Sequence, residues 1–296
     1  MRLKHKEIKC KSRSDTFTLY ALGDVHIGAR SCAEKQFKKV VGQIRDDPNA
    51  LWVGGGDYIN AIKPQDVKRY NPEEMPDWML DGKADEVRAK LSDVVKQEIE
   101  RFAELVVTIQ DKCLGLIEGN HEHSMKAHYN HNVMRALCDR LEVDNLTDCA
   151  FLRLSFLREY KESCATKTVK VFVAHGTGGG RTPGAEPNKL FRLAADKDAD
   201  IFLCGHTHTF CILPPIPVLY IPIAGEMPKE ALVKYKRAAN WGCWVRGFAA
   251  GPSTYDSRAL YPVRPLSTLK CIIRPHRGTT NSSAQCGTIS MEEVVL

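Results

Sequence analysis

The chain has 296 residues, of which 26% are charged and 43% belong to the hydrophobic set. This balance is typical of a folded globular protein and excludes a disordered chain. The formal net charge of +6 is a mild basic excess, which permits contact with nucleic acid without requiring it. No uninterrupted apolar stretch is long enough to cross a bilayer, so we expect no membrane contact.

The N-terminal residues and the cysteines indicate in which cellular compartment the protein resides. Residues 1–13 are basic and contain no apolar segment of the kind that precedes the cleavage site of a secretion signal. The eleven cysteines are an odd number and include no Cys-x-x-Cys pair, which is typical of reduced thiols rather than of a disulfide framework. We therefore expect a cytoplasmic protein.

Short apolar runs rich in β-branched and aromatic residues alternate with helical patterns along the chain. The runs predict buried strands over residues 16–22, 50–53, 114–117, 169–174 and 201–204. Helical patterns predict helices over residues 33–46, 84–109 and 187–195. Strands that alternate with helices are typical of an α/β fold.

The composition indicates one domain with two dissimilar ends. Residues 1–14 form a basic arm, for which a solvated terminus is favoured over a nucleic-acid contact, and residues 15–273 form the domain. Residues 63–83 are polar and contain several prolines, so they predict a loop or cap inserted in the domain. Between residues 214 and 269, prolines and aromatic residues favour short edge strands. Residues 274–296 are rich in Gly, Ser, Thr and Asn and predict a flexible tail.

Each predicted strand is followed by side chains of the types that bind metal ions. The five segments are Gly23-Asp24-Val25-His26, Gly56-Asp57, Gly119-Asn120-His121-Glu122, His175-Gly176 and Gly205-His206-Thr207-His208. In open α/β sheets, functional sites lie at the carboxyl ends of the strands, and the adjacent glycines allow tight turns there. Any one of these segments is a common turn or cap, but chance does not explain five at the same end of five strands.

The residue types in these segments favour a reactive metal site. Two Asp, one Asn and four His offer imidazole nitrogen and hard oxygen atoms without thiolate, which suits manganese, iron, zinc or nickel better than structural zinc or calcium. Seven ligands are too many for one ion that must keep an open position. They predict two divalent transition-metal ions that share a carboxylate.

In their order, the segments resemble the signature of the calcineurin-like metallophosphoesterase superfamily, which is Asp-x-His, Gly-Asp, Gly-Asn-His-Glu/Asp, a His and Gly-His-x-His. Outside residues 24–208 there is only a general likeness to compact, stand-alone prokaryotic or phage members. The resemblance implies a two-sheet αββα sandwich with the site at the carboxyl ends of the strands. It also implies a dinuclear metal centre, for which manganese is the preferred ion.

The resemblance further implies a role for each residue of the signature. One metal ion would be held by Asp24, His26 and His208. The other would be held by Asn120, His175 and His206. Asp57 would bridge the two ions, and His121 would contact the scissile phosphate without binding metal.

The activity implied by the resemblance is hydrolysis of a phosphate mono- or diester by attack of a metal-bridging hydroxide. The alternative within the enzymes is a metal-dependent nuclease acting on DNA or RNA. The alternative outside them is a non-catalytic scaffold, which is disfavoured because all seven ligands are present. A protein Ser/Thr phosphatase is also disfavoured, because that branch has Asp and Arg where this chain has Asn60 and Ala61.

Segments outside the signature are expected to choose the substrate, because metal ligands contact only the phosphate. The candidates are the loop of residues 63–83 and the glycine-rich turn of residues 176–184. In that turn Arg181 could clamp a second phosphate, and a simple flexible turn is an equally good interpretation. The expected partner is a phosphate ester, with a nucleotide or nucleic acid among the candidates. The oligomeric state stays open.

Two further groups of residues admit two interpretations each. His123, His128 and His131 could surround the metal ligands, but a polar helix face is the favoured interpretation. Trp241 and Trp244 could stack a base, but packing against the sheet is favoured.

Overall fold

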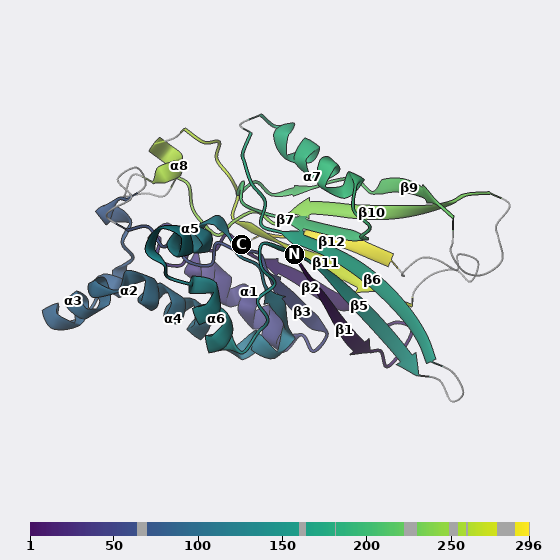
Figure 1. Cartoon of the computed structure of the whole chain (residues 1–296), viewed down its shortest axis with the longest axis horizontal. Coiled ribbons are helices and arrows are strands. Elements are labelled where there is room, and N and C mark those ends of the chain that lie inside the picture. The colour runs from purple at the N-terminus through teal and green to yellow at the C-terminus, as the bar shows by residue number, and fades with distance from the viewer. Residues whose placement is uncertain are drawn as a thin grey trace.

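The computed structural model describes residues 1–63, 70–159, 164–180, 182–221, 230–248, 254–258, 260–276 and 288–295. Within these residues, two β-sheets pack face to face, and helices cover the outer face of each sheet (Figure 1). The α/β class and the two-sheet αββα sandwich that the sequence predicts are therefore confirmed. In the described part of the chain, every helix is too short or too polar to span a bilayer.

The larger sheet has seven strands and delivers two of the ligand-bearing loops. Its strand order is β1-β5-β6-β7-β10-β8, and β9 pairs with β10. The strands are β1 (Arg2–Lys9), β5 (Cys149–Glu159), β6 (Cys164–Ala174), β7 (Ile201–Cys204), β8 (Cys211–Ile212), β9 (Ile216–Tyr220) and β10 (Leu232–Asn240). Strands β6, β7 and β10 are parallel, so their carboxyl ends meet at one edge of the sheet.

The smaller sheet has five strands and delivers the other three ligand-bearing loops. Its order is β12-β11-β2-β3-β4. The strands are β2 (Phe17–Leu22), β3 (Ala50–Gly54), β4 (Cys113–Leu116), β11 (Ser267–Arg274) and β12 (Thr288–Val295). Strands β2, β3 and β4 are parallel and almost fully buried, which explains why they read as continuous apolar runs.

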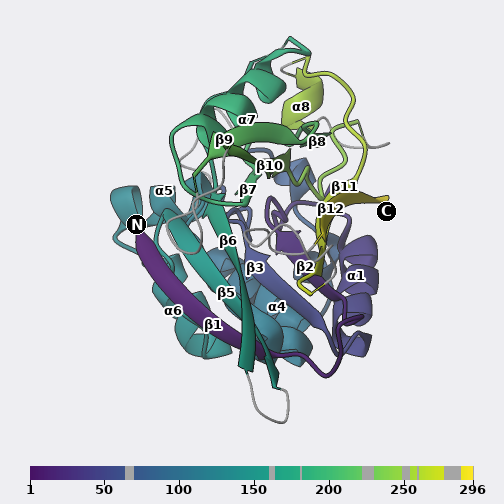
Figure 2. The same ribbon diagram turned by 90° about the vertical axis from the view of Figure 1, so that its right-hand side faces the viewer.

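Amphipathic helices close the two outer layers (Figure 2). Helices α1 (Glu34–Asp46), α4 (Val94–Val106) and α6 (Val133–Leu141) cover the smaller sheet, and α7 (Ala185–Ala195) covers the larger one. In α1, the residues Phe37, Val40, Val41 and Ile44 recur at helical spacing and are all buried. The other helical segments are η1 (Pro72–Glu74), α2 (Asp77–Leu80), α3 (Ala84–Ser92), η2 (Val107–Lys112), α5 (Asn120–Tyr129) and α8 (Tyr255–Arg258).

The prediction of one continuous helix over residues 84–109 is wrong. The chain instead forms α3 and α4, separated at Asp93, whose side chain accepts a hydrogen bond from the backbone N–H of Lys96 and so caps α4. Leu91 is 40% exposed, so the apolar residues of α3 do not continue the buried face of α4.

Both chain ends are also more ordered than the sequence predicts. Arg2–Lys9 is no solvated terminus, because β1 pairs with β5 in parallel over its whole length. Thr288–Val295 is no flexible tail, because β12 pairs with β11; residues 277–287 lie outside the described residues. Strand β1 exposes most of its side chains and is held by backbone hydrogen bonds, which leave no signal in the apolar pattern.

Two inner segments differ in part from expectation. Within the predicted insertion of residues 63–83, η1 and α2 are short helical turns, and residues 64–69 lie outside the described residues. Between residues 214 and 269, β9 fits the predicted edge strand, but β10 lies inside the larger sheet between β7 and β8.

Candidate metal centre

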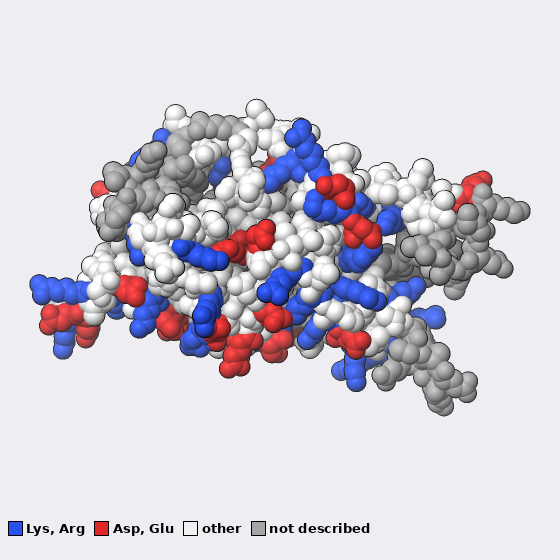
Figure 3. Space-filling view, viewed as in Figure 1, with Lys and Arg blue, Asp and Glu red and all other residues white. Residues whose placement is uncertain are grey.

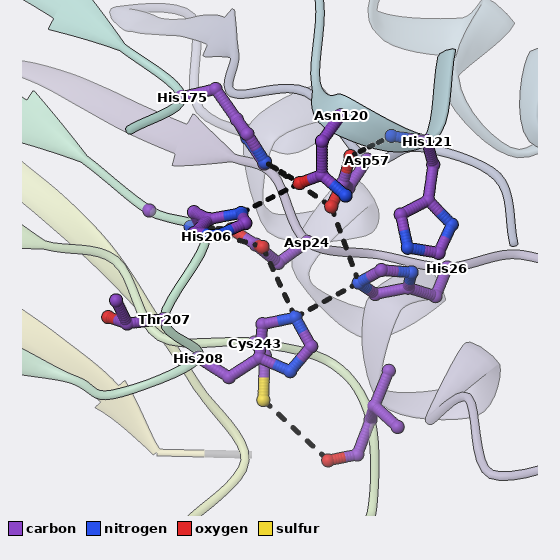
Figure 4. A network of polar contacts seen from close by, with 12 residues as sticks. Asp24, His26, Asp57, Asn120, His121, His175, His206, Thr207, His208 and Cys243 are labelled. Carbon is purple, nitrogen blue, oxygen red and sulfur yellow. Dashed lines mark hydrogen bonds and ion pairs between the residues drawn. The ribbon is translucent and has the colours of Figure 1, made fainter. Parts of the chain in front are cut away.

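The loops that follow β2, β3, β4, β6 and β7 converge at one point, where the candidate ligands face one another (Figure 4). Backbone hydrogen bonds join the first two loops: the N–H of Asp24 donates to the carbonyl of Gly56 at 2.9 Å, and the N–H of His26 to that of Asp57 at 3.0 Å. The sequence expectation that these residues share one site thus agrees with their positions.

The first group comprises Asp24, His26 and His208, whose ligand atoms lie within 4.8 Å of one another. The Nε2 atom of His208 lies 3.3 Å from Asp24 Oδ1 and 3.0 Å from Nε2 of His26. Asp24 is completely buried and His26 is 5% exposed. Buried polar atoms at such spacing need a shared partner, such as a proton or a cation.

The second group comprises Asn120, His175 and His206. The Oδ1 atom of Asn120 lies 3.0 Å from His175 Nε2 and 2.7 Å from His206 Nδ1. Nδ1 of His175 lies 2.7 Å from the carbonyl oxygen of Gly55, which can only accept, so Nδ1 carries a proton and Nε2 faces the site.

Asp57 lies between the two groups. Its Oδ2 atom is 3.2 Å from His175 Nε2 and 3.9 Å from His26 Nε2, while Oδ1 accepts the backbone N–H of His121 at 2.9 Å. One oxygen is therefore held by the start of α5, and the other faces both groups. Gly119 permits this approach, since a Cβ there would lie 2.2 Å from Asp57 Oδ1.

The spacing of these atoms fits bound metal ions. Two ligands at ~2.1 Å from one ion and at a right angle to each other are separated by about 3 Å. The distances between facing ligand atoms in both groups, 2.7 to 3.3 Å, are close to that separation. Imidazole, carboxylate and amide donors also suit divalent transition metals. The residues present could hold metal; the assignment of each as a ligand stays a prediction.

Backbone strain concentrates at the same residues. Non-glycine residues with positive φ include five of the candidate ligands: Asp24, His26, Asp57, His206 and His208. Left-handed backbone at such residues costs about 1–3 kcal/mol each and clusters at functional sites. The two histidines after β7 therefore do not continue a strand; each is turned individually toward the site.

Burial and mutual charge set the protonation of the cluster. Burial opposes ionisation of Asp57, but His175, His121 and His26 hold the pKa of Asp57 well below its usual range. Burial favours neutral His175, yet Asp57 raises the pKa of His175 to about 10. Burial, together with His121 and His208, lowers the pKa of His26. An anionic Asp57 thus faces a proton on His175, which a metal cation would displace.

His121 is oriented by main-chain atoms. Its Nδ1 lies 2.5 Å from the carbonyl oxygen of Asn60, and its ring packs edge-on against His26 with centroids 4.6 Å apart. An acceptor for His121 therefore remains at position 60, although the side chain there is no carboxylate. A ring nitrogen of His121 also comes within 4.8 Å of the ligand atoms of His26 and Asp57.

Sequence reasoning missed the role of Glu122. Its buried carboxylate accepts backbone N–H groups of Asp57 at 2.9 Å, Tyr58 at 2.8 Å and Gly119 at 3.0 Å, and so ties the loop after β3 to the start of α5. An acidic residue three positions after the residue that caps a helix is a capping-box signal, which could have revealed it.

Other predicted residues have different outcomes. Arg181 lies outside the described residues. His123 and His128 are exposed on α5, in agreement with the polar-face interpretation, but half-buried His131 lies after the end of that helix. Trp241 and Trp244 are fully buried, so neither is available to stack a base.

A cavity of about 310 Å³ opens in front of the cluster and is lined by His26, Asp57, His121 and His206 on the ligand side. Tyr261 and Arg264 line it as well, with the guanidinium carbon of Arg264 4.9 Å from the centroid of the Tyr261 ring. A volume of this size suits a small molecule or the end of a longer one.

The αββα sandwich, with candidate metal ligands at the carboxyl ends of its strands, agrees with the fold that the sequence resemblance implies. A family model described as calcineurin-like phosphoesterase matches residues 17–210, which is well over half of the chain. The chain belongs to the calcineurin-like phosphoesterase family.

Distant similarities to solved structures include three proteins. They are the calcineurin-like phosphoesterase YfkN from Bacillus subtilis (12% identity, 95% of this chain and 90% of that chain, TM-score 0.44), a double mutant of Vps29 from Entamoeba histolytica (13%, 95% and 99%, 0.37) and the NAD nucleotidase NadN from Haemophilus influenzae (11%, 95% and 50%, 0.37). No curated protein matches the chain. The family assignment therefore rests on the family model.

Proposed function

We propose that the protein hydrolyses a phosphate mono- or diester with the help of two divalent transition-metal ions, manganese being the preferred ion. The observation that carries this proposal is the position of Asp57 Oδ2, which faces His175 of one ligand group and His26 of the other. A carboxylate oxygen shared in this way suits two ions better than one.

The residues of the first group, Asp24, His26 and His208, would hold one ion, and those of the second group the other. Metal ions bound there would supply a coordinated water of lowered pKa and neutralise charge on the phosphoryl oxygens. His121 would contact the phosphate, and in its protonated form its Nε2 would donate to the leaving oxygen. The carbonyl of Asn60 keeps the ring in that orientation through Nδ1.

We favour a small phosphate ester in the cytoplasm over a nucleic acid as the substrate. The cavity in front of the cluster is about 310 Å³. On the face shown in Figure 3, basic and acidic side chains are intermixed and form no continuous basic surface of the kind that tracks a nucleic-acid backbone. A nuclease remains the rival activity to be tested.

The test is a metal titration followed by a substrate screen. Protein stripped with a chelator and reloaded with Mn²⁺ should contain close to two ions per chain by elemental analysis. The loaded protein should then hydrolyse p-nitrophenyl phosphate or bis-p-nitrophenyl phosphate, with cyclic nucleotides and single-stranded DNA as further substrates. One ion at saturation would overturn the dinuclear centre. Two ions without activity on any ester would favour the scaffold, and activity on DNA alone would favour the nuclease.

A further inference from the structure

Trp241 lies outside the segment that matches the family model and outside every ligand-bearing loop, yet it touches the metal-ligand cluster. It directly follows β10, and its side chain is completely buried. Its indole N–H donates a hydrogen bond of 2.6 Å to Asp24 Oδ2. The other oxygen of Asp24 faces His208. The backbone N–H of His206 donates to both oxygens, at 3.2 Å to Oδ1 and 3.1 Å to Oδ2, whereas the indole contacts Oδ2 and so favours the presentation of Oδ1 to the first ligand group.

The ring of Trp241 also sets the spacing of three loops. A Cβ added to Gly23 would lie 2.8 Å from the indole, one on Gly55 2.4 Å and one on Gly205 2.2 Å. These glycines stand one or two residues before Asp24, Asp57 and His206. The loops thus pack against the indole at distances that only a residue without a side chain allows.

The residue before Trp241 secures the last of these loops. Asn240 is completely buried, and its amide donates to Thr207 Oγ1 at 2.9 Å and to the carbonyl of Gly205 at 3.2 Å. The same amide donates to Glu186 on α7 at 2.7 Å. Thr207 stands between His206 and His208 in the sequence. The hydrogen bonds of Asn240 therefore connect the end of β10 to the loop that carries both histidines.

We propose that Trp241 is a positioning residue for the metal centre, and this inference rests on the proposed function. Without the indole N–H, Asp24 Oδ2 would keep the hydrogen bond from the backbone N–H of His206, which both oxygens share, but it would lose the shorter bond that distinguishes it from Oδ1, and the carboxylate could turn. The ion held by Asp24, His26 and His208 should then bind more weakly, while the ion held by the second group is affected less. Residues behind metal ligands typically change metal affinity by about 10–100-fold.

The test uses Trp241→Phe, which keeps an aromatic ring but removes the donor. We expect its Kd for Mn²⁺ to rise by about 10–100-fold at one of the two sites, so that a calorimetric titration becomes clearly biphasic. The d–d absorption of the Co²⁺-loaded protein should also change, because the oxygen ligand is no longer fixed. Neither readout requires catalysis.

A matched control is Trp244→Phe. Trp244 is equally buried, but within the described residues its Nε1 has no hydrogen-bond partner, so the substitution removes ring volume without removing a bond to a ligand. We expect both metal sites of this variant to keep their wild-type Kd within about twofold. An equal weakening in the two variants would assign the effect to packing and overturn the proposal.

If Trp241→Phe does not fold, benzothienylalanine at position 241 replaces it, because that residue keeps the bicyclic ring and lacks the N–H. Circular dichroism of the metal-free proteins checks folding. A wild-type chain that binds no metal would overturn the proposed function itself. A wild-type chain that binds two ions, with unchanged affinity in the folded variant, would overturn only the positioning role.

Discussion

Two parts of the chain meet at the same cavity but contribute different groups. They are the loops between residues 23 and 208 and the described residues of the later segment, 240–264. The loops carry all seven candidate ligands and His121. The later segment contributes Trp241, which donates to the candidate ligand Asp24, and Arg264, which lines the cavity.

We expect the loops to carry the groups that react, and the later segment to support the candidate ligands and contact the rest of the substrate. Ligands for a metal ion are restricted to a few residue types and to narrow distances, so the loops have little freedom to vary. Residues that support a ligand or contact the rest of a substrate can do so with many side chains. We therefore expect the later segment to contribute to substrate choice, together with the loop of residues 63–83 and the glycine-rich turn of residues 176–184.

The largest effect should come from the loops, at Asp57. Asp57→Asn keeps the size of the side chain and an acceptor for the N–H of His121, but it removes the charge that faces both ligand groups. We expect kcat/KM to fall about 10⁴-fold, as on removal of a central catalytic group. Elemental analysis should show fewer than two ions per chain. The control is Asp139→Asn on the exposed face of α6, and a variant at position 57 with two ions and near-normal activity would refute the shared role.

A second, smaller effect tests whether His121 serves chemistry or binds metal. His121→Ala should lower kcat by about 10²–10⁴-fold while both ions stay bound, and less so for esters with good leaving groups. His123→Ala is the matched control, because His123 lies on the same helix with its side chain 67% exposed. Loss of an ion from the variant at position 121 would instead make it a ligand beside His26 and Asp57.

The same comparison explains how much could be predicted from the sequence. The loops were predictable because Asp, Asn and His directly after apolar runs are a local signal, and five such signals agree. The fold was predictable where strands are buried on both faces, as in β2 and β7. Polar β1 left no such signal, because an edge strand is held by its backbone.

The supporting residues could not be predicted for a related reason. Trp241 and Trp244 are both buried tryptophans three residues apart, and within the described residues Trp241 is the one whose indole donates to a candidate ligand. Which of them does so depends on how β10 packs beside β7, which is a tertiary contact without a local sequence pattern. Glu122 acts through backbone groups that any residue could provide.

A third prediction concerns Glu98, a buried residue that contacts the loop after β3, and the pH dependence of the unfolding free energy. Glu98 on α4 is 1% exposed and accepts the backbone N–H of Ala61 at 2.8 Å, next to the carbonyl that orients His121. Burial raises the pKa of Glu98 to about 8, and Glu122 adds to the rise. Because the folded-state pKa lies above the unfolded one, the stability contributed by protonated Glu98 is complete below about pH 4.5 and is lost as pH rises through 8.

Glu98→Gln should remove this loss, since its amide keeps an acceptor for Ala61 but cannot ionise. Relative to wild type, we expect the variant to gain on the order of 3 kcal/mol of unfolding free energy between pH 5 and pH 8. Denaturant unfolding of both proteins across that range measures the gain. The exposed Glu104→Gln, also on α4, should show no such pH dependence. Parallel stability curves for wild type and Glu98→Gln would contradict the prediction.

The smallest expected effect lies in the later segment, at Arg264. Among the described residues that line the cavity, Arg264 is the one Lys or Arg, and its guanidinium lies over the Tyr261 ring. A guanidinium can bind an anionic group that the substrate carries beside the phosphate to be cleaved, and one charge-assisted hydrogen bond is worth about 1.5–3 kcal/mol. Arg264→Ala should therefore raise KM about tenfold for a substrate with a second phosphate and leave kcat nearly unchanged.

The Michaelis constant for p-nitrophenyl phosphate, which has no such group, should stay at the wild-type value. Arg258→Ala on α8 is the control, because Arg258 is exposed and does not line the cavity. An equal rise in KM for both substrates would show that Arg264 shapes the cavity generally and does not select for a second anionic group.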